Sequence, residues 1–124
     1  MGWIGVDLDA TLAHYDGWMD GQIGDPIPAM VNRVRAWLSD GKEVRIFTAR
    51  VAGSMLTNDE GTQDNTQFVQ DQEKKIQGWC IKHIGCQLPI TATKDFAMIE
   101  LWDDRCVQVV PNTGEMVKSW GIER

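Results

Sequence analysis

The chain has 124 residues, which is enough for one domain around a single hydrophobic core and too few for a second full domain. Its formal net charge of −6 argues against broad electrostatic capture of nucleic acid, because such capture needs Lys and Arg opposite the phosphates. The N-terminus has no signal-peptide pattern, and no apolar run approaches the roughly 18 residues of a membrane span. The three cysteines do not have the spacing of a disulfide framework or of a zinc site. We therefore expect one cytoplasmic domain over residues 1–124, with no membrane partner.

The first half of the chain has two strand patterns with a helix pattern between them. Residues 3–8 are a short apolar run that ends in acid, as is typical of a buried parallel strand. Residues 10–26 are rich in Gly and Asp without a steady period, which indicates a loop or small flap. Apolar residues at helical spacing from Ile27 to Leu38 predict a helix, with Pro28 in its first turn and Gly41 just past its end. Residues 43–48 alternate in polarity and predict a second strand.

The second half is predicted to contain a loop, a helix and several short strands. Residues 51–65 are polar and are expected to form only a loop. An apolar face at helical spacing predicts a helix from about residue 65 to 84, although Gln72 and Glu73 interrupt that face. The strand candidates are residues 88–92, 98–102, 107–110 and, after a Pro-Asn-Thr-Gly turn, 116–120.

Acidic and hydroxyl side chains follow three of the predicted strands. The alternation of strands and helices predicts an α/β fold with a mainly parallel sheet. Ligands of such open sheets bind in the crevice beyond the carboxyl ends of the strands. We therefore expect these side chains to converge on one site, namely Asp7 and Asp9 after the first strand, Thr48 after the second, and Asp103 with Asp104 after a later one.

Phosphoryl transfer explains this choice of residue types. A carboxylate can act as the nucleophile by forming an aspartyl-phosphate, and Asp7 is the candidate. Asp9 would protonate the leaving oxygen and then activate water. Mg²⁺ would relieve the repulsion among the carboxylates. The expected metal ligands are Asp7, the backbone carbonyl of Asp9, and Asp103 or Asp104.

Three short motifs resemble those of the haloacid dehalogenase-like (HAD) superfamily. Residues 7–12, Asp-Leu-Asp-Ala-Thr-Leu, resemble its DxDxT motif; residues 47–50, Phe-Thr-Ala-Arg, resemble its second motif; residues 102–105, Trp-Asp-Asp-Arg, resemble its acidic fourth motif. The resemblance implies a Rossmann-like three-layer sandwich with a mainly parallel sheet. The short segments after the first and second motifs imply a member without a cap domain and with an open site.

The resemblance also implies roles for individual residues. Asp7 would be the nucleophile, Asp9 the general acid and base, and Thr48 the hydroxyl that binds the phosphoryl group, with Thr11 and Ala49 beside the substrate. Asp104 matches the direct metal ligand, and Asp103 would hold a metal-bound water. The third motif is a single lysine, for which Lys94 is the first candidate and Lys74, Lys75 and Lys82 are alternatives.

One position departs from the superfamily pattern. Residue 10 is Ala10, where phosphatases of this kind usually have glycine. A Cβ at this position restricts the backbone in the turn after the nucleophile. Because Ala10 removes no reacting group, we still expect activity.

Three functions remain open on these grounds. The first is an Mg²⁺-dependent phosphatase for a nucleotide or other small phosphorylated compound. The second is a 3′-phosphatase for nucleic acid ends. Arg50 and residues 103–105 resemble the corresponding motifs in the phosphatase domain of polynucleotide kinase-phosphatases. By that resemblance Arg50 could grip a substrate phosphate. The third is a non-catalytic, Mg²⁺-binding module of the same fold. Tyr15 and Trp18 in the flap could stack on a base or simply pack, and the oligomeric state stays open.

Overall fold

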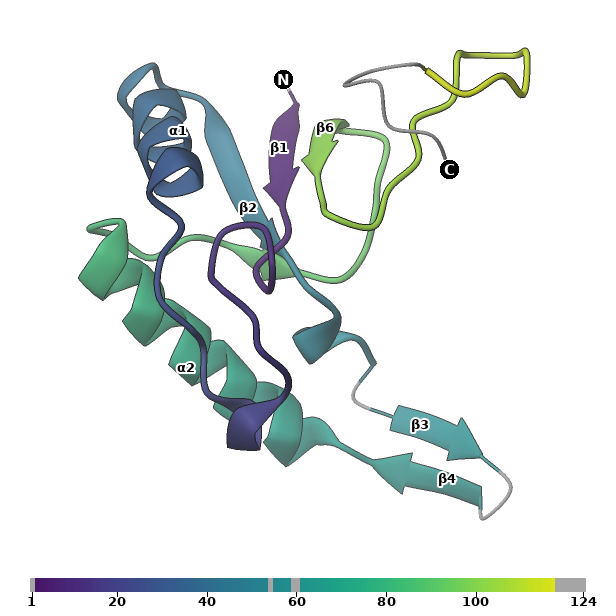
Figure 1. Cartoon of the computed structure of the whole chain (residues 1–124). Helices are drawn as coiled ribbons and strands as arrows, with labels where there is room; N and C mark the ends of the chain where they lie inside the picture. Colours follow the sequence, from purple (N-terminus) through teal and green to yellow (C-terminus); the bar gives the residue numbers. More distant parts are fainter. Residues whose placement is uncertain (1, 54, 59–60, 118–124) are drawn as a thin grey trace.

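A four-stranded parallel sheet forms the centre of the computed structural model, which describes residues 2–53, 55–58 and 61–117 (Figure 1). The strands run in the order β5-β2-β1-β6, and every neighbouring pair is parallel. This confirms the predicted α/β fold with a parallel sheet. The strand bounds are β1 Trp3–Val6, β2 Glu43–Phe47, β5 Ile90–Thr91 and β6 Met98–Trp102.

Two helices connect the strands close to where the sequence predicts them. Helix α1, Pro28–Ser39, joins β1 to β2, and helix α2, Thr66–His83, lies between β2 and β5. Pro28 occupies the first turn of α1, where its missing N–H is not needed. Gly41 follows the helix end with a φ of 80°, a conformation that glycine adopts without strain. Among the described residues, neither helix is long and apolar enough to cross a membrane.

Both helices pack against the same face of the sheet. Side chains from β1, β2, α1 and α2 belong to one hydrophobic core, and the helices touch directly where Nη2 of Arg35 donates to the carbonyl of His83 at 2.7 Å. The described residues therefore make two layers, where the sequence analysis expects three. The core-facing pairs in the sheet are Ile4 opposite Val44 and Val6 opposite Ile46.

On the opposite face of the sheet, side chains cover the central strand. Trp3 is only 1% exposed although no helix of the described chain lies over it. The Arg45 guanidinium lies 4.5 Å from the Trp3 ring centroid, and Phe47 stacks beside that ring at 6.5 Å. The Trp3 indole N–H donates to Oδ1 of Asp95 at 2.8 Å. Aromatic and cation–π contacts thus replace a third layer at this position.

Two of the expected segments differ in the structure. Residues 51–65 were expected to form only a loop, but they contain an antiparallel hairpin of β3, Met55–Asn58, and β4, Gly61–Asp64, which points away from the sheet in Figure 1. Residues 107–110 form no strand and make only an isolated bridge between Val109 and Met116. Residues 118–120 of the last predicted strand lie outside the described residues.

The flap, residues 10–26, is an ordered loop closed at its base. The backbone N–H of Ile27 donates to the Leu12 carbonyl at 2.9 Å, and that of His14 donates to the Asp25 carbonyl at 2.7 Å. The flap contains one turn of 3₁₀ helix, η1, Met19–Gly21. Its far side is fixed to α2, because the Trp79 indole N–H donates to the Gly24 carbonyl at 2.9 Å.

Candidate active site

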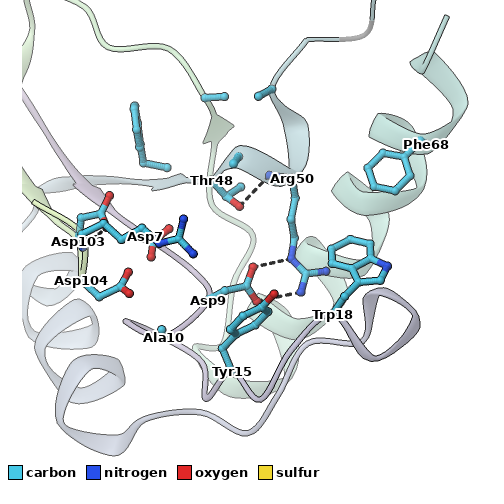
Figure 2. A pocket seen from close by; sticks show the side chains of 15 residues that line it. Asp7, Asp9, Ala10, Tyr15, Trp18, Thr48, Arg50, Phe68, Asp103 and Asp104 are labelled. Atoms are coloured by element: carbon cyan, nitrogen blue, oxygen red, sulfur yellow. Dashed lines mark hydrogen bonds and ion pairs between the residues drawn. The ribbon is translucent and has the colours of Figure 1, made fainter. Parts of the chain in front are cut away.

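An open pocket of about 500 Å³ lies at the carboxyl ends of the parallel strands (Figure 2). This volume is in the usual range for small-molecule sites. Its lining comes from the segments after β1, β2 and β6, as the sequence analysis predicts, together with the flap and the start of α2. The predicted site residues among those that line it are Asp7, Asp9, Thr48, Ala49, Arg50, Asp103 and Asp104.

Three of these carboxylates form a compact acidic cluster. Asp7 follows β1, and Asp103 and Asp104 follow the neighbouring strand β6. Each contributes one oxygen, and these oxygens all lie within 4.8 Å of one another. Carboxylate oxygens at this spacing suit a hard divalent cation.

Backbone and side-chain contacts position Asp7. Its N–H donates to the Trp102 carbonyl at 2.8 Å, which extends the β1–β6 pairing by one residue. The Thr11 hydroxyl donates to Oδ2 of Asp7 at 3.2 Å. Burial, together with the Asp103 and Asp104 carboxylates, raises the pKa of Asp7 to about 7, although the Thr11 hydrogen bond lowers it. Thr11 does not itself line the pocket, so its observed role is to hold Asp7.

Asp9 is paired with a buried arginine and stands apart from the acidic cluster. Nε of Arg50 donates to one Asp9 carboxylate oxygen at 2.7 Å, and Nη2 donates to the other at 2.8 Å. The Arg50 side chain is 3% exposed and that of Asp9 is 22% exposed. This two-point contact fixes both the position and the plane of the Asp9 carboxylate.

All five N–H donors of Arg50 have acceptors within the protein. Besides the two bonds to Asp9, Nη1 donates to the Gly21 carbonyl at 2.7 Å and to Oε1 of Gln72 at 2.9 Å, and Nη2 donates to the Gln22 carbonyl at 3.3 Å. Arg50 therefore joins the flap, α2 and Asp9. The expected grip of Arg50 on a substrate phosphate would require some of these bonds to break, so the contacts assign it to positioning instead.

The Thr48 hydroxyl is oriented by the turn that follows β2. Thr48 is 2% exposed and precedes the 3₁₀ turn η2, Ala49–Val51. Its Oγ1 accepts from the backbone N–H of Arg50 at 3.2 Å. Among the described residues its O–H donor has no acceptor, so it is available to a ligand in the pocket.

The structure does not bring Lys94 into the pocket. Lys94 is exposed in the segment between β5 and β6 and is not among the lining residues. The alternatives Lys74, Lys75 and Lys82 lie along α2, and none of them lines this pocket either. Arg105 does line it, and within the described chain its guanidinium has no hydrogen bond or ion pair. The positive charge expected from a lysine is thus offered here by an arginine.

The backbone at Ala10 adopts a conformation that glycine adopts more readily than alanine. Ala10 has a φ of 71°, in the left-handed region that residues with a Cβ rarely adopt. Its N–H donates to the Ala13 carbonyl at 2.8 Å, so the tight turn that begins the flap keeps this conformation. The turn that follows Asp9 thus forms with alanine at this position, and the strain is of order 1 kcal/mol.

Gln72 and Phe68 are site residues that the sequence analysis does not identify. Gln72 is only noted as an interruption of the apolar face of the second helix, but it is 3% exposed and accepts a hydrogen bond from Arg50. A polar residue in the middle of an apolar helix face is a signal that could have indicated a buried polar partner. Phe68, which the sequence analysis does not single out, lines the pocket and is 43% exposed.

Comparisons with protein-family models, with curated proteins and with solved structures found no match for this chain. Its function must therefore be inferred from the geometry of the site and from the motifs within it.

Proposed function

We propose that this protein is an Mg²⁺-dependent phosphomonoester hydrolase that works through an aspartyl-phosphate on Asp7. The observation that carries the proposal is the acidic cluster of Asp7, Asp103 and Asp104 in one pocket with the Thr48 hydroxyl and the oriented Asp9 carboxylate. The resemblance of residues 7–12, 47–50 and 102–105 to HAD motifs supports the same chemistry.

The donor set of the acidic cluster fits Mg²⁺. Its oxygens lie within 4.8 Å of one another, and their mutual repulsion contributes to the raised pKa of Asp7. Asp7, Asp103 and Asp104 would hold the ion, which when bound neutralises charge on the carboxylates and on the phosphate.

The reaction would proceed in two displacements at phosphorus. In the first, a carboxylate oxygen of Asp7 forms a bond to phosphorus, the bond to the leaving oxygen breaks, and Asp9 gives that oxygen a proton. In the second, Asp9 takes a proton from water, the water oxygen bonds to phosphorus, and the bond between phosphorus and the Asp7 oxygen breaks, which regenerates the Asp7 carboxylate and frees inorganic phosphate. The Thr48 hydroxyl and the Arg105 guanidinium would bind the phosphoryl oxygens in both steps.

A phosphatase assay tests the proposal. We expect the purified protein to hydrolyse p-nitrophenyl phosphate with Mg²⁺ and to lose this activity with EDTA. Asp7→Asn should abolish turnover because an amide is not a nucleophile, whereas Asp40→Asn, at the exposed end of α1, should retain it. The absence of turnover with any phosphomonoester, from a folded protein with Mg²⁺ bound, would refute catalysis and favour the non-catalytic binding module.

The alternative of a 3′-phosphatase for nucleic acid ends has weaker support. It depends on the resemblance of residues 103–105 and on Arg50 as a substrate contact, and all five Arg50 donors are already used inside the protein. The net charge of −6 also opposes a long polyanionic substrate. A small phosphorylated compound in the cytoplasm remains the favoured substrate.

A further inference from the structure

Three exposed aromatic side chains line the pocket away from the acidic cluster. Tyr15 and Trp18 come from the flap, and Phe68 comes from the first turn of α2. They are 39%, 45% and 43% exposed, respectively. In Figure 2, Asp9 lies between the acidic cluster and the Trp18 and Phe68 rings. Aromatic rings with this much exposure in a concave site offer binding surface to a ligand.

Two of these rings, Trp18 and Phe68, are held in place before any ligand binds. Trp18 stacks on Phe68, with ring centroids 6.0 Å apart and an interplanar angle of 27°. The Arg50 guanidinium carbon lies 4.8 Å from the Trp18 ring centroid. Arg50 also bonds to the carbonyls of Gly21 and Gln22, so the turn that follows Trp18 is fixed. A rigid surface loses little conformational entropy when a ligand binds to it.

The rest of the pocket favours a flat, apolar ligand group over a polyhydroxylated one. Besides Tyr15, Trp18 and Phe68, nine residues line the pocket outside the acidic cluster. Five of them, Phe47 and four alanines, have no polar side-chain atoms, and the others are Asp9, Thr48, Arg50 and Arg105. The buried Arg50 has no free donor for a sugar hydroxyl. Nucleobases and aryl groups, by contrast, stack on aromatic side chains through their faces.

We propose that Tyr15, Trp18 and Phe68 form a stacking subsite for the leaving group, which makes aromatic phosphomonoesters, and nucleoside monophosphates in particular, the preferred substrate class. This inference rests on the proposed phosphatase function. The phosphate would lie at the acidic cluster and the nucleobase on the aromatic surface of the same pocket.

Substrate comparison tests the subsite. We expect wild-type protein to have a higher kcat/KM for adenosine monophosphate than for ribose 5-phosphate, which lacks only the base. The Tyr15→Leu, Phe68→Leu double variant keeps apolar bulk but loses two rings, so the ratio of the two kcat/KM values should fall by about tenfold or more. Phe96→Leu, which removes a fully exposed ring outside the pocket, should keep the wild-type ratio.

A binding measurement separates failure of the subsite from failure of the phosphatase. Calorimetry can measure the affinity of the Asp7→Asn variant for adenosine monophosphate and for ribose 5-phosphate. This measurement does not depend on turnover. Tighter binding of the nucleotide, weakened by the Tyr15 and Phe68 changes, supports the subsite even if wild-type protein hydrolyses nothing. Equal binding of both ligands, or an unchanged preference in the double variant, overturns it. A 3′-phosphorylated dinucleotide tests whether the bound nucleobase belongs to a free nucleotide or to a nucleic acid end. A higher kcat/KM for the dinucleotide than for the mononucleotide would support the subsite with a nucleic acid end as its ligand.

Discussion

At the scale of single residues, the pair of Arg50 and Asp9 shows how a carboxylate in the pocket is oriented. Asp9 alone could rotate about its side-chain bonds, but two hydrogen bonds from one planar guanidinium fix its orientation. Arg50 is in turn fixed by acceptors from the flap and α2. The sequence places these residues 41 positions apart, and no local pattern predicts that they meet.

Arg50→Lys should reduce kcat more than it raises KM, because lysine keeps the charge but lacks the fork that orients Asp9. We expect kcat to fall about 10- to 100-fold, with a much smaller change in KM, in steady-state assays with p-nitrophenyl phosphate. Arg50→Ala should in addition lower the free energy of unfolding by about 3 kcal/mol, because Asp9 and Gln72 lose their partner. Arg45→Lys, on the opposite face of the sheet, is the control. A rise in KM with unchanged kcat would indicate that Arg50 contacts substrate instead.

At the scale of elements, the flap and α2 together determine the shape of one side of the pocket. The flap contributes Tyr15 and Trp18, and α2 contributes Phe68 and Gln72. They are joined near the pocket by the Trp18–Phe68 stack, and at the base of the flap by the hydrogen bond from the Trp79 indole N–H to the carbonyl of Gly24. A substitution that opens the base of the flap should therefore alter the pocket, although the substituted residue does not line it.

Gly24→Ala should disrupt the flap, because an added Cβ would overlap the His14 carbonyl oxygen. We expect a loss of about 2 kcal/mol in the free energy of unfolding and a fall in activity, measured by urea denaturation and phosphatase assay. Gly78→Ala is the matched control, since its Cβ would meet nothing within 4 Å on the exposed side of α2. It should stabilise the protein by about 1 kcal/mol, because alanine has the higher helix propensity. Equal effects of the two changes would contradict this account of the flap.

At the scale of the whole molecule, the acidic cluster couples folding stability to pH and, under the proposed function, to Mg²⁺. The pKa of Asp7 rises from its ordinary 3.8 to about 7 in the folded protein. Between these values the folded state binds the proton more tightly than the unfolded chain does. The contribution of Asp7 to stability is therefore fully present below about pH 4 and is lost as the pH rises towards 7.

Unfolding of the metal-free protein in EDTA should reveal this dependence. We expect the free energy of unfolding to decrease from pH 5 to pH 8 more steeply in wild-type protein than in Asp7→Asn, which cannot titrate. Because a cation favours the ionised carboxylates, Mg²⁺ should stabilise wild-type protein more at pH 8 than at pH 5. The same pH slope in both proteins, measured by urea denaturation, would contradict the raised pKa of Asp7.

Local patterns of the sequence predict most of the fold. Residues 98–102 are predicted and observed as a strand, and the second helix begins and ends within one residue of its predicted bounds. These elements are predictable because burial on one side imposes a period on the residues themselves. The hairpin of β3 and β4 is missed because its two short strands show no alternation of apolar and polar residues: the apolar pair Met55 and Leu56 is adjacent in sequence, and β4 is GTQD.

The order of residues along the chain by itself determines that Asp7, Asp9, Thr48 and Asp103 follow strands, because side-chain polarity changes where each strand ends. The tertiary structure alone decides which side chains meet. Packing around the sheet pairs Asp9 with Arg50, leaves Lys94 outside the pocket and places Arg105 within it. It also exposes Phe68 beside Trp18, since contacts between segments distant in the chain depend on how helices and loops pack in three dimensions.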